Sequence, residues 1–294
     1  MIYLMISSLV WAFSYGLIKG NLTQLSPDFV AFSRLIIPFL LFFPLLKVKN
    51  LSFKKIFLFL SIGAVQYGVM YLCVIRSYQY LSAYQVVFFT AFTPIYVVLI
   101  DDVFTRSFKP FYLLTSLLAF LGVGLLYYQG VSLSQVWEGF ILVQFSDLCF
   151  AFGQVAYKRL RMQEGKMKDE NIYALLFLGG ALITGVSTTA FGGWSSISFL
   201  SFKQMWLLIY LGLIASGLCF FFWNKAAVKT PSGTLAIFNN VKIPLGVLVS
   251  IVFFGEEASR VPLLISLFLI GLALFLSESY ARKKSVYALV KNSK

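Results

Sequence analysis

The sequence of 294 residues contains no histidine and only three cysteines, which removes two common kinds of site. Without histidine there is no imidazole proton relay and no histidine-ligated metal. The cysteines, Cys73, Cys149 and Cys219, each lie in an apolar run, and their spacing fits neither a zinc site nor a disulfide framework. We therefore expect no metal and no cofactor.

Charge is equally scarce. Only 12% of the residues are charged, against about 25% in an ordinary soluble domain. Hydrophobic residues make up 60% of the chain, and the mean hydropathy is +0.86. This composition predicts an all-α integral membrane protein that crosses the bilayer many times.

Signatures of other function classes are missing as well. The sequence has no P-loop, no paired carboxylates inside an apolar run and no Ser/His arrangement, so we expect no ATP hydrolysis and no enzyme. The net charge of +13 is spread over short breaks between apolar runs. That placement is an orientation signal rather than a nucleic-acid surface, and no nucleic-acid partner is expected.

Runs of about 20 apolar residues predict membrane-spanning helices. Ten such runs follow one another with short connections and no inserted soluble domain. The first lacks a basic leader and a small-residue cleavage site, which indicates a retained helix. The predicted spans are 2–20, 28–46, 56–76, 82–101, 110–128, 136–157, 173–191, 204–223, 233–254 and 261–279.

Lysine and arginine set the predicted orientation. Eighteen of them fall in the connections and the tail on one side, and three, Arg76, Lys203 and Arg260, fall on the other. Because cytoplasmic loops carry the excess of positive charge, both termini are predicted to be cytoplasmic. The predicted location is the cell inner membrane, as a multi-pass protein.

The two halves of the sequence resemble each other. "WAFSYGLIK" (11–19) aligns with "FAFGQVAYK" (150–158), and "SAYQVVFFTAFTPIYVV" (82–98) aligns with "SGTLAIFNNVKIPLGVL" (232–248). Five spans are an odd number, so two repeats of five would cross the membrane in opposite senses, as in many secondary transporters. The predicted units are a first repeat over 1–130, a second over 131–280 and a basic cytoplasmic tail over 281–294.

Two segments resemble a known family. "WNKAAVKTPSGTLAIFNNVKIPLGVLVSIVFFGEE" (223–257) is similar to the eighth and ninth spans of EamA-type members of the drug/metabolite transporter superfamily, in its Trp-x-x-Ala, Pro244 and Gly255-Glu256. "PDFVAFSRLIIPFLLF" (27–42) resembles the second span, with Arg34 in its usual place. The resemblance implies ten helices in two inverted halves, a central cavity, spans five and ten on the outside, and small polar metabolites as substrates. "IDDVFTR" departs from the expected Gly-Glu, which weakens any role for Asp101 or Asp102.

Polar residues inside the ninth span are the strongest site signal. Lys242 lies about mid-span, where a lysine costs roughly 2.5–3.5 kcal/mol. Asn239 shares its helical face, and Asn240 lies beside it. We interpret Lys242 as a substrate anchor, with a structural ion pair as the alternative. Pro244, like Pro94 in the first half, removes a backbone donor and predicts a hinge with a freed carbonyl, on Asn240 and Thr90 respectively.

Further candidates line other spans. In the sixth, Asp147 and Gln154 belong to a polar stripe, and Asp147 could couple protons or neutralise Lys242 or Arg34. Arg34 could bind substrate or extend outward to the interface, and Lys19 and Lys158 are expected as interfacial anchors. Gln66 and Tyr71 in the third span, and Trp11 in the first, are candidate cavity residues, with packing as the alternative for Trp11.

The predicted function is alternating-access transport of a small polar metabolite. Lys19, Arg34 and Lys242 lie within apolar runs, and Asp147 is the only acid well inside a span. This balance favours a carboxylate- or phosphate-bearing substrate, an amino acid or a nucleotide-like compound. Proton-coupled efflux of cationic or lipophilic compounds through Asp147 is the alternative. The expected partners are the substrate and the lipid bilayer, with a monomer or a weak homodimer as the assembly.

Overall fold

The computed structural model describes residues 1–49, 51–126, 133–163, 167–254 and 260–292. Within these ranges the regular elements are all helices. Eight segments of the described ranges are long and apolar enough to cross a membrane. They are Ile2–Asn21, Pro27–Leu45, Phe53–Ser77, Gln85–Thr105, Val136–Gln163, Tyr173–Ala190, Phe202–Lys229 and Val261–Lys283.

Each of these eight overlaps a predicted span. The other two predicted spans fall on α7 (Pro110–Leu126), whose apolar part Pro110–Gly124 is shorter, and on α12 (Ser232–Phe254). The helix α13 (Arg260–Asn292) continues beyond the predicted span end into the basic segment. The Gly255-Glu256 pair of the family resemblance lies outside the described residues.

The third and eighth predicted spans share an interruption that the sequence did not predict. The third consists of α3 (Phe53–Gly63), a π-helical turn η2 (Ala64–Val69) and α4 (Met70–Ser77). The eighth consists of α10 (Phe202–Tyr210), a π-helical turn η6 (Leu211–Leu218) and α11 (Cys219–Lys229). Single π-turns within helices are rare and often mark functional sites. Because each π-helical turn lies in the middle of its span, the two halves of the chain share this feature.

The fourth predicted span is also broken. It runs as α5 (Ala83–Phe89), a 3-10 turn η3 (Thr90–Phe92) and α6 (Thr93–Thr105). Pro94 stands in the first turn of α6, where a missing N–H costs nothing. The predicted free carbonyl of Thr90 is not free, because it accepts from the Thr93 hydroxyl at 2.6 Å. Pro244 lies inside α12 without ending it.

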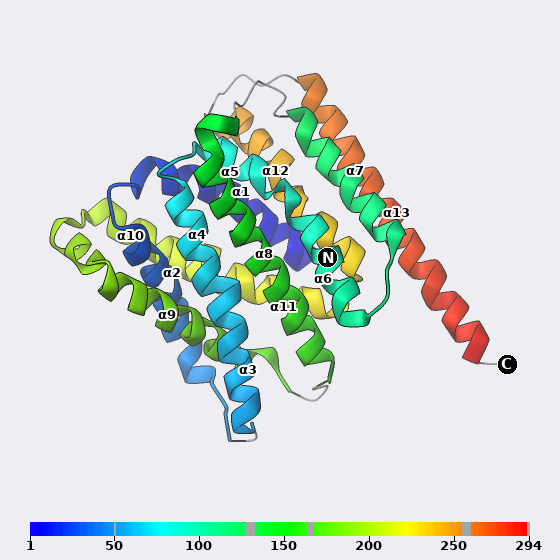
Figure 1. Cartoon of the computed structure of the whole chain (residues 1–294), viewed down its shortest axis with the longest axis horizontal. Helices are drawn as coiled ribbons and strands as arrows, with labels where there is room; N and C mark the ends of the chain where they lie inside the picture. The colour runs from blue at the N-terminus through cyan, green and yellow to red at the C-terminus, as the bar shows by residue number, and fades with distance from the viewer. Residues whose placement is uncertain (50, 127–132, 164–166, 255–259, 293–294) are drawn as a thin grey trace.

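The packing of the halves is reciprocal. The helix α1 (Ile2–Asn21) packs against α12 and α11, and α8 (Leu133–Gln163) packs in the same way against α6 and α4. The helix α2 (Pro27–Phe42) contacts η6, and α9 (Tyr173–Ala190) contacts η2. Helices α7 and α13 lie side by side along one edge of the molecule (Figure 1). These two helices thus lie at the outside of the bundle that the other helices form.

Close backbone approach depends on glycine at the contact between α3 and α9. A Cβ on Gly63 would lie 1.9 Å from the Leu176 carbonyl oxygen, and one on Gly179 would lie 2.0 Å from the Leu60 carbonyl oxygen. Backbone atoms cannot move aside as a side chain can. Small residues at helix contacts let membrane helices approach in this way, and they hold α9 against the first half.

Candidate functional site

A cavity of about 80 Å³ lies among the helices of the bundle. It is bounded by α1, α2, α4, η3, α8, α12 and the Phe220 side chain of α11. Five residues proposed from the sequence line it: Trp11, Arg34, Tyr71, Asp147 and Lys242. The structure thus brings together candidates from five different spans.

Lys242 is buried, with 6% of its surface exposed, although it carries an ammonium group. Its Nζ lies 5.8 Å from the centre of the Trp11 ring and 5.9 Å from that of Tyr15. Among the residues that the structure describes, it makes no hydrogen bond and no ion pair within 4 Å. Aromatic faces stabilise such a cation only in part, by about 2 kcal/mol when it is desolvated.

Asp147 faces the same cavity and is 5% exposed. Its Oδ2 has no hydrogen-bond partner, and neither Lys242 nor Arg34 lies within ion-pair distance of it in the described part of the chain. The neutralising ion pair, one of the two alternatives for Asp147, is therefore not formed. Lys242 and Asp147 remain close enough to interact through space.

Arg34 is buried and does not extend to the interface, so the outward-reaching interpretation is wrong. Its Nη2 donates to the Tyr71 hydroxyl at 2.6 Å, and its Nε donates to the Ser216 hydroxyl at 3.2 Å. Tyr71 and Ser216 also share a hydrogen bond of 2.8 Å. Neutral oxygens thus hold the guanidinium in place, and its charge is not cancelled by a carboxylate within 4 Å in the described ranges.

The remaining candidates lie outside the cavity lining. Gln66 forms two reciprocal amide hydrogen bonds with Asn224, of 3.0 and 3.1 Å, and lies between α8 and α11. Gln154, Asn239 and Asn240 are buried beyond the cavity. Asn240 donates to the Ala91 carbonyl at 3.1 Å.

Several cavity residues were not proposed from the sequence. They are aromatic or hydroxyl side chains, which are common in this chain, and position alone did not distinguish them. The structure adds Tyr15, Tyr78, Thr90, Ser146, Phe150 and Phe220. Of these, Tyr78 has a buried hydroxyl without a partner among the described residues.

A cluster of aromatic rings closes one end of the cavity. The Trp11 ring lies 4.9 Å from that of Trp223 and 5.3 Å from that of Phe220, and Phe150 lies 6.0 Å from Trp11. Trp11 is fixed by a hydrogen bond of 2.7 Å from its Nε1 to the Ala215 carbonyl. Both interpretations of Trp11 thus hold, since it lines the cavity and packs. We call Trp11, Phe150, Phe220 and Trp223 the aromatic plug.

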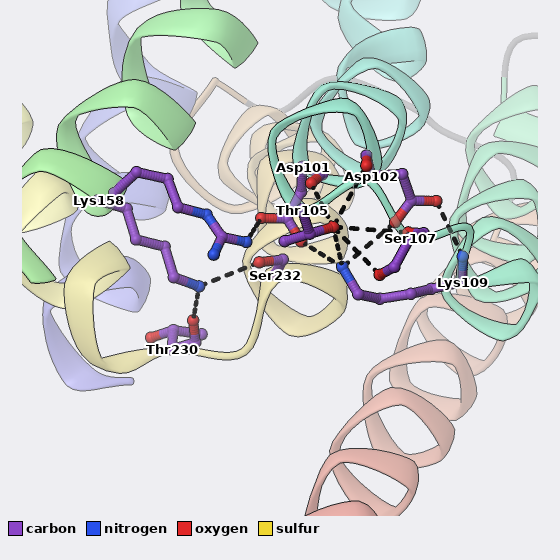
Figure 2. A network of polar contacts seen from close by, with 9 residues as sticks. Asp101, Asp102, Thr105, Ser107, Lys109, Lys158, Thr230 and Ser232 are labelled. Atoms are coloured by element: carbon purple, nitrogen blue, oxygen red, sulfur yellow. Dashed lines mark hydrogen bonds and ion pairs between the residues drawn. The ribbon is translucent and has the colours of Figure 1, made fainter.

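Beyond the plug a charged cluster joins the ends of α6 and α8. Asp101 pairs with Arg159 and with Lys109, the latter at 3.0 Å, and Asp102 pairs with Lys109 at 3.3 Å. Lys158 donates to the Thr230 carbonyl at 2.6 Å and to the Ser232 hydroxyl at 3.1 Å (Figure 2). Lys158 is therefore a buried cross-link rather than an interfacial anchor.

Comparison with known proteins identifies the family to which this chain belongs. The EamA-like transporter family model matches residues 1–128 and 137–278. The chain belongs to the EamA-like transporter family. It is accordingly a transporter and not an enzyme, and it is a multi-pass protein of the inner membrane, as the sequence predicted.

Curated relatives carry a substrate in their names. A biotin transporter of Salmonella typhimurium is 34% identical over 288 residues, covering 97% of this chain and 94% of the relative. A biotin transporter of Escherichia coli is 34% identical, covering 87% and 86%, and a probable biotin transporter of Pseudomonas aeruginosa is 32% identical, covering 87% and 90%. A solved structure described as "Crystal structure of protein" matches with a TM-score of 0.71 at 15% identity, covering 96% of each chain, which supports the fold.

These names correct the predicted substrate. The expectation of an amino acid or a nucleotide-like compound, and of amino acid transport, is wrong, because the relatives over most of the chain are named for a vitamin. The alternative of efflux of cationic or lipophilic compounds finds no support in these names either. A cationic side chain attracts any organic acid, so the sequence could indicate an anion without identifying it.

Proposed function

We propose that this chain transports biotin across the inner membrane, with Lys242 as the anchor for the substrate carboxylate. The buried ammonium of Lys242, which lines the cavity without a hydrogen bond or ion pair to the described residues, is the observation that carries the proposal. Biotin is an organic acid with one negative charge at neutral pH. A carboxylate placed at Lys242 would supply the charge-assisted hydrogen bond that the protein itself does not provide.

The charge of the cavity supports this substrate. Arg34 and Lys242 contribute two positive charges, against one negative charge if Asp147 is ionised. One bound monoanion would bring the sum to zero, which favours its entry into a site of low dielectric constant. Trp11, Tyr15, Tyr71 and Phe150 would pack against the apolar parts of the molecule.

We further propose ten membrane-spanning helices in two inverted repeats of five, with both termini in the cytoplasm and a monomer as the working unit. The matching π-turns, the reciprocal helix contacts and the two separately matched segments 1–128 and 137–278 support the repeat. The excess of lysine and arginine supports the orientation. A single chain supplies every wall of the cavity, which supports the monomer.

In this orientation the cavity extends toward the periplasm and the charged cluster lies on the cytoplasmic side. The cavity includes Ile18 of α1 and Tyr78, which follows α4, near the end that carries Lys19. The aromatic plug and the Asp101–Arg159 pair would close the path to the cytoplasm. We propose alternating access, in which these contacts separate while the opposite end closes.

Counterflow in proteoliposomes tests the proposed substrate. Vesicles containing the purified protein are loaded with unlabelled biotin and diluted into radiolabelled biotin, so that exchange is seen whatever the direction of net transport. We expect transient accumulation of label, blocked by excess biotin and unaffected by amino acids. Absence of accumulation by folded protein, together with exchange of another solute, would refute the proposal.

A further inference from the structure

Two amide side chains beyond the aromatic plug continue the polar face of the cavity. Gln154 lies on α8 seven residues after Asp147, and Asn239 lies on α12 three residues before Lys242. Both are fully buried and neither lines the cavity. Because three and seven residues return to the same helical face, each amide stands in line with a charged cavity residue.

The orientations of these amides are fixed by their neighbours. Trp223 Nε1 donates to Gln154 Oε1 at 3.0 Å, so this atom of Gln154 must be the oxygen. Asn239 Nδ2 donates to the Leu235 carbonyl at 3.0 Å, so this atom of Asn239 must be the nitrogen. Exchanging oxygen and nitrogen in either amide would set two donors or two acceptors against each other.

This assignment leaves one donor and one acceptor unused. Gln154 Nε2 and Asn239 Oδ1 are buried and have no hydrogen-bond partner in the described part of the protein. In the amides of Gln66 and Asn224, in contrast, each nitrogen and each oxygen has a partner. A buried polar atom without a partner costs about 1–3 kcal/mol. A ligand that supplied the missing bonds would recover this cost.

The unused groups fit the edge of a cyclic urea. A urea presents a carbonyl acceptor next to an N–H donor, which matches the Gln154 Nε2 donor and the Asn239 Oδ1 acceptor. Asn239 lies three residues, about 4.5 Å along α12, from Lys242, whose side chain extends into the cavity. A molecule held at the Lys242 ammonium would thus have its ring end within reach of the amide pair.

The aromatic plug stands between the two positions. Phe150 lies on α8 between Asp147 and Gln154, and Trp11 lies near both Lys242 and Trp223, the partner of Gln154. Both rings are cavity walls on one side. Joining the cavity to the amide pair would require these two side chains to rotate, which for Trp11 means breaking its hydrogen bond to the Ala215 carbonyl.

We propose that Gln154 and Asn239 form an inner subsite that binds the cyclic urea of the substrate when the aromatic plug opens. This inference rests on the proposed transport of biotin. It assigns substrate specificity to two residues that do not line the cavity in the present structure. Lys242 would select for an acid, and the amide pair would select for the urea.

Lipoate provides the comparison substrate, because it has the same acid chain on a sulfur-containing ring but lacks the urea. Counterflow of radiolabelled biotin and of radiolabelled lipoate is measured for wild type, Q154M and N239L, with melting curves to establish folding. The control is Q144L on the same helix, whose amide bonds to the Tyr96 hydroxyl and the Phe89 carbonyl and does not line the cavity. Two variants on different helices keep the test valid if one of them does not fold.

We expect the ratio of biotin to lipoate counterflow to fall about tenfold in Q154M and N239L, through loss of biotin transport alone. In Q144L the ratio should remain that of wild type. An unchanged ratio in both subsite variants, or an equal fall for both acids, would overturn the inner subsite while leaving biotin transport intact. Failure of the wild type to exchange biotin would instead refute the proposed function.

Discussion

The ammonium nitrogen of Lys242 lies 5.8 Å from the centre of the Trp11 ring, across the contact between α12 and α1. No carboxylate of the described residues lies within 4 Å of that nitrogen. A lysine held by aromatic faces leaves its three donors unused. This is the arrangement that an anion-binding site needs before its ligand arrives.

Trp11 therefore has two separable functions. Replacement by phenylalanine, W11F, keeps a ring beneath Lys242 and removes the hydrogen bond to the Ala215 carbonyl. Replacement by leucine, W11L, removes the ring as well. We expect W11F to bind biotin within about threefold of wild type and W11L about tenfold more weakly. Equilibrium binding of radiolabelled biotin in detergent checks this, and equal affinities of both variants would contradict it.

Arg34 depends on Tyr71 for its position. In Y71F the Arg34 Nη2 loses its acceptor at 2.6 Å and retains the Ser216 contact of its Nε. A hydrogen bond to a charged group contributes about 1.5–3 kcal/mol, so the melting temperature should fall measurably. Thermal unfolding in detergent is the measurement. The control Y15F alters a cavity tyrosine for which no hydrogen bond is seen within the described ranges, and an equal decrease there would refute the assignment.

The α3–α9 contact allows a direct test of close packing. In G63A the added methyl group would meet the Leu176 carbonyl, and in G179A it would meet that of Leu60. We expect both variants to lose most of their folded yield, since overpacking costs about 1–3 kcal/mol or more. G16A is the matched control, because a Cβ there has no atom within 4 Å. Normal melting of G63A and G179A would contradict the described helix contact.

The Asp101–Arg159 pair links α6 to α8 and should stabilise the state that faces outward. In D101N this link and the Lys109 contact weaken. We expect slower labelling of I75C, a cavity position, by a membrane-impermeant maleimide from the periplasmic side. E170Q is the control. It removes the ion pair between Glu170 and Lys225. The hydrogen bond from Lys225 holds the pKa of Glu170 below its usual value, and this ion pair is therefore charged at neutral pH. Equal effects of D101N and E170Q on the labelling rate would contradict a role of the Asp101–Arg159 pair in closing the cytoplasmic side.

Most of the helices could be predicted because apolar runs and their length follow directly from the bilayer. The π-turns η2 and η6 could not, since no residue type specifies them and they depend on tertiary packing. Lys158 was interpreted as an interfacial anchor because sequence position alone suggested a helix end. In the structure the α11–α12 connection covers it, and it donates to Thr230 and Ser232.

Site residues could be predicted from the sequence where a charged side chain lies within an apolar span, because burying such a group there is costly. Lys242, Arg34 and Asp147 are rare in apolar spans, and all three line the cavity. Gln66 is as conspicuous in the sequence, yet it pairs with Asn224. Whether a buried polar side chain faces a partner or a cavity depends on the other helices, and a single sequence does not contain that information.

The most direct test of the central claim compares biotin with its neutral amide. Equilibrium binding of both compounds is measured for wild type and for K242M, with melting curves to confirm that the variant is folded. If Lys242 anchors the carboxylate, wild type binds biotin about 10- to 100-fold more tightly than the amide, and K242M binds both with the same affinity. The same preference for biotin in folded K242M would contradict the account.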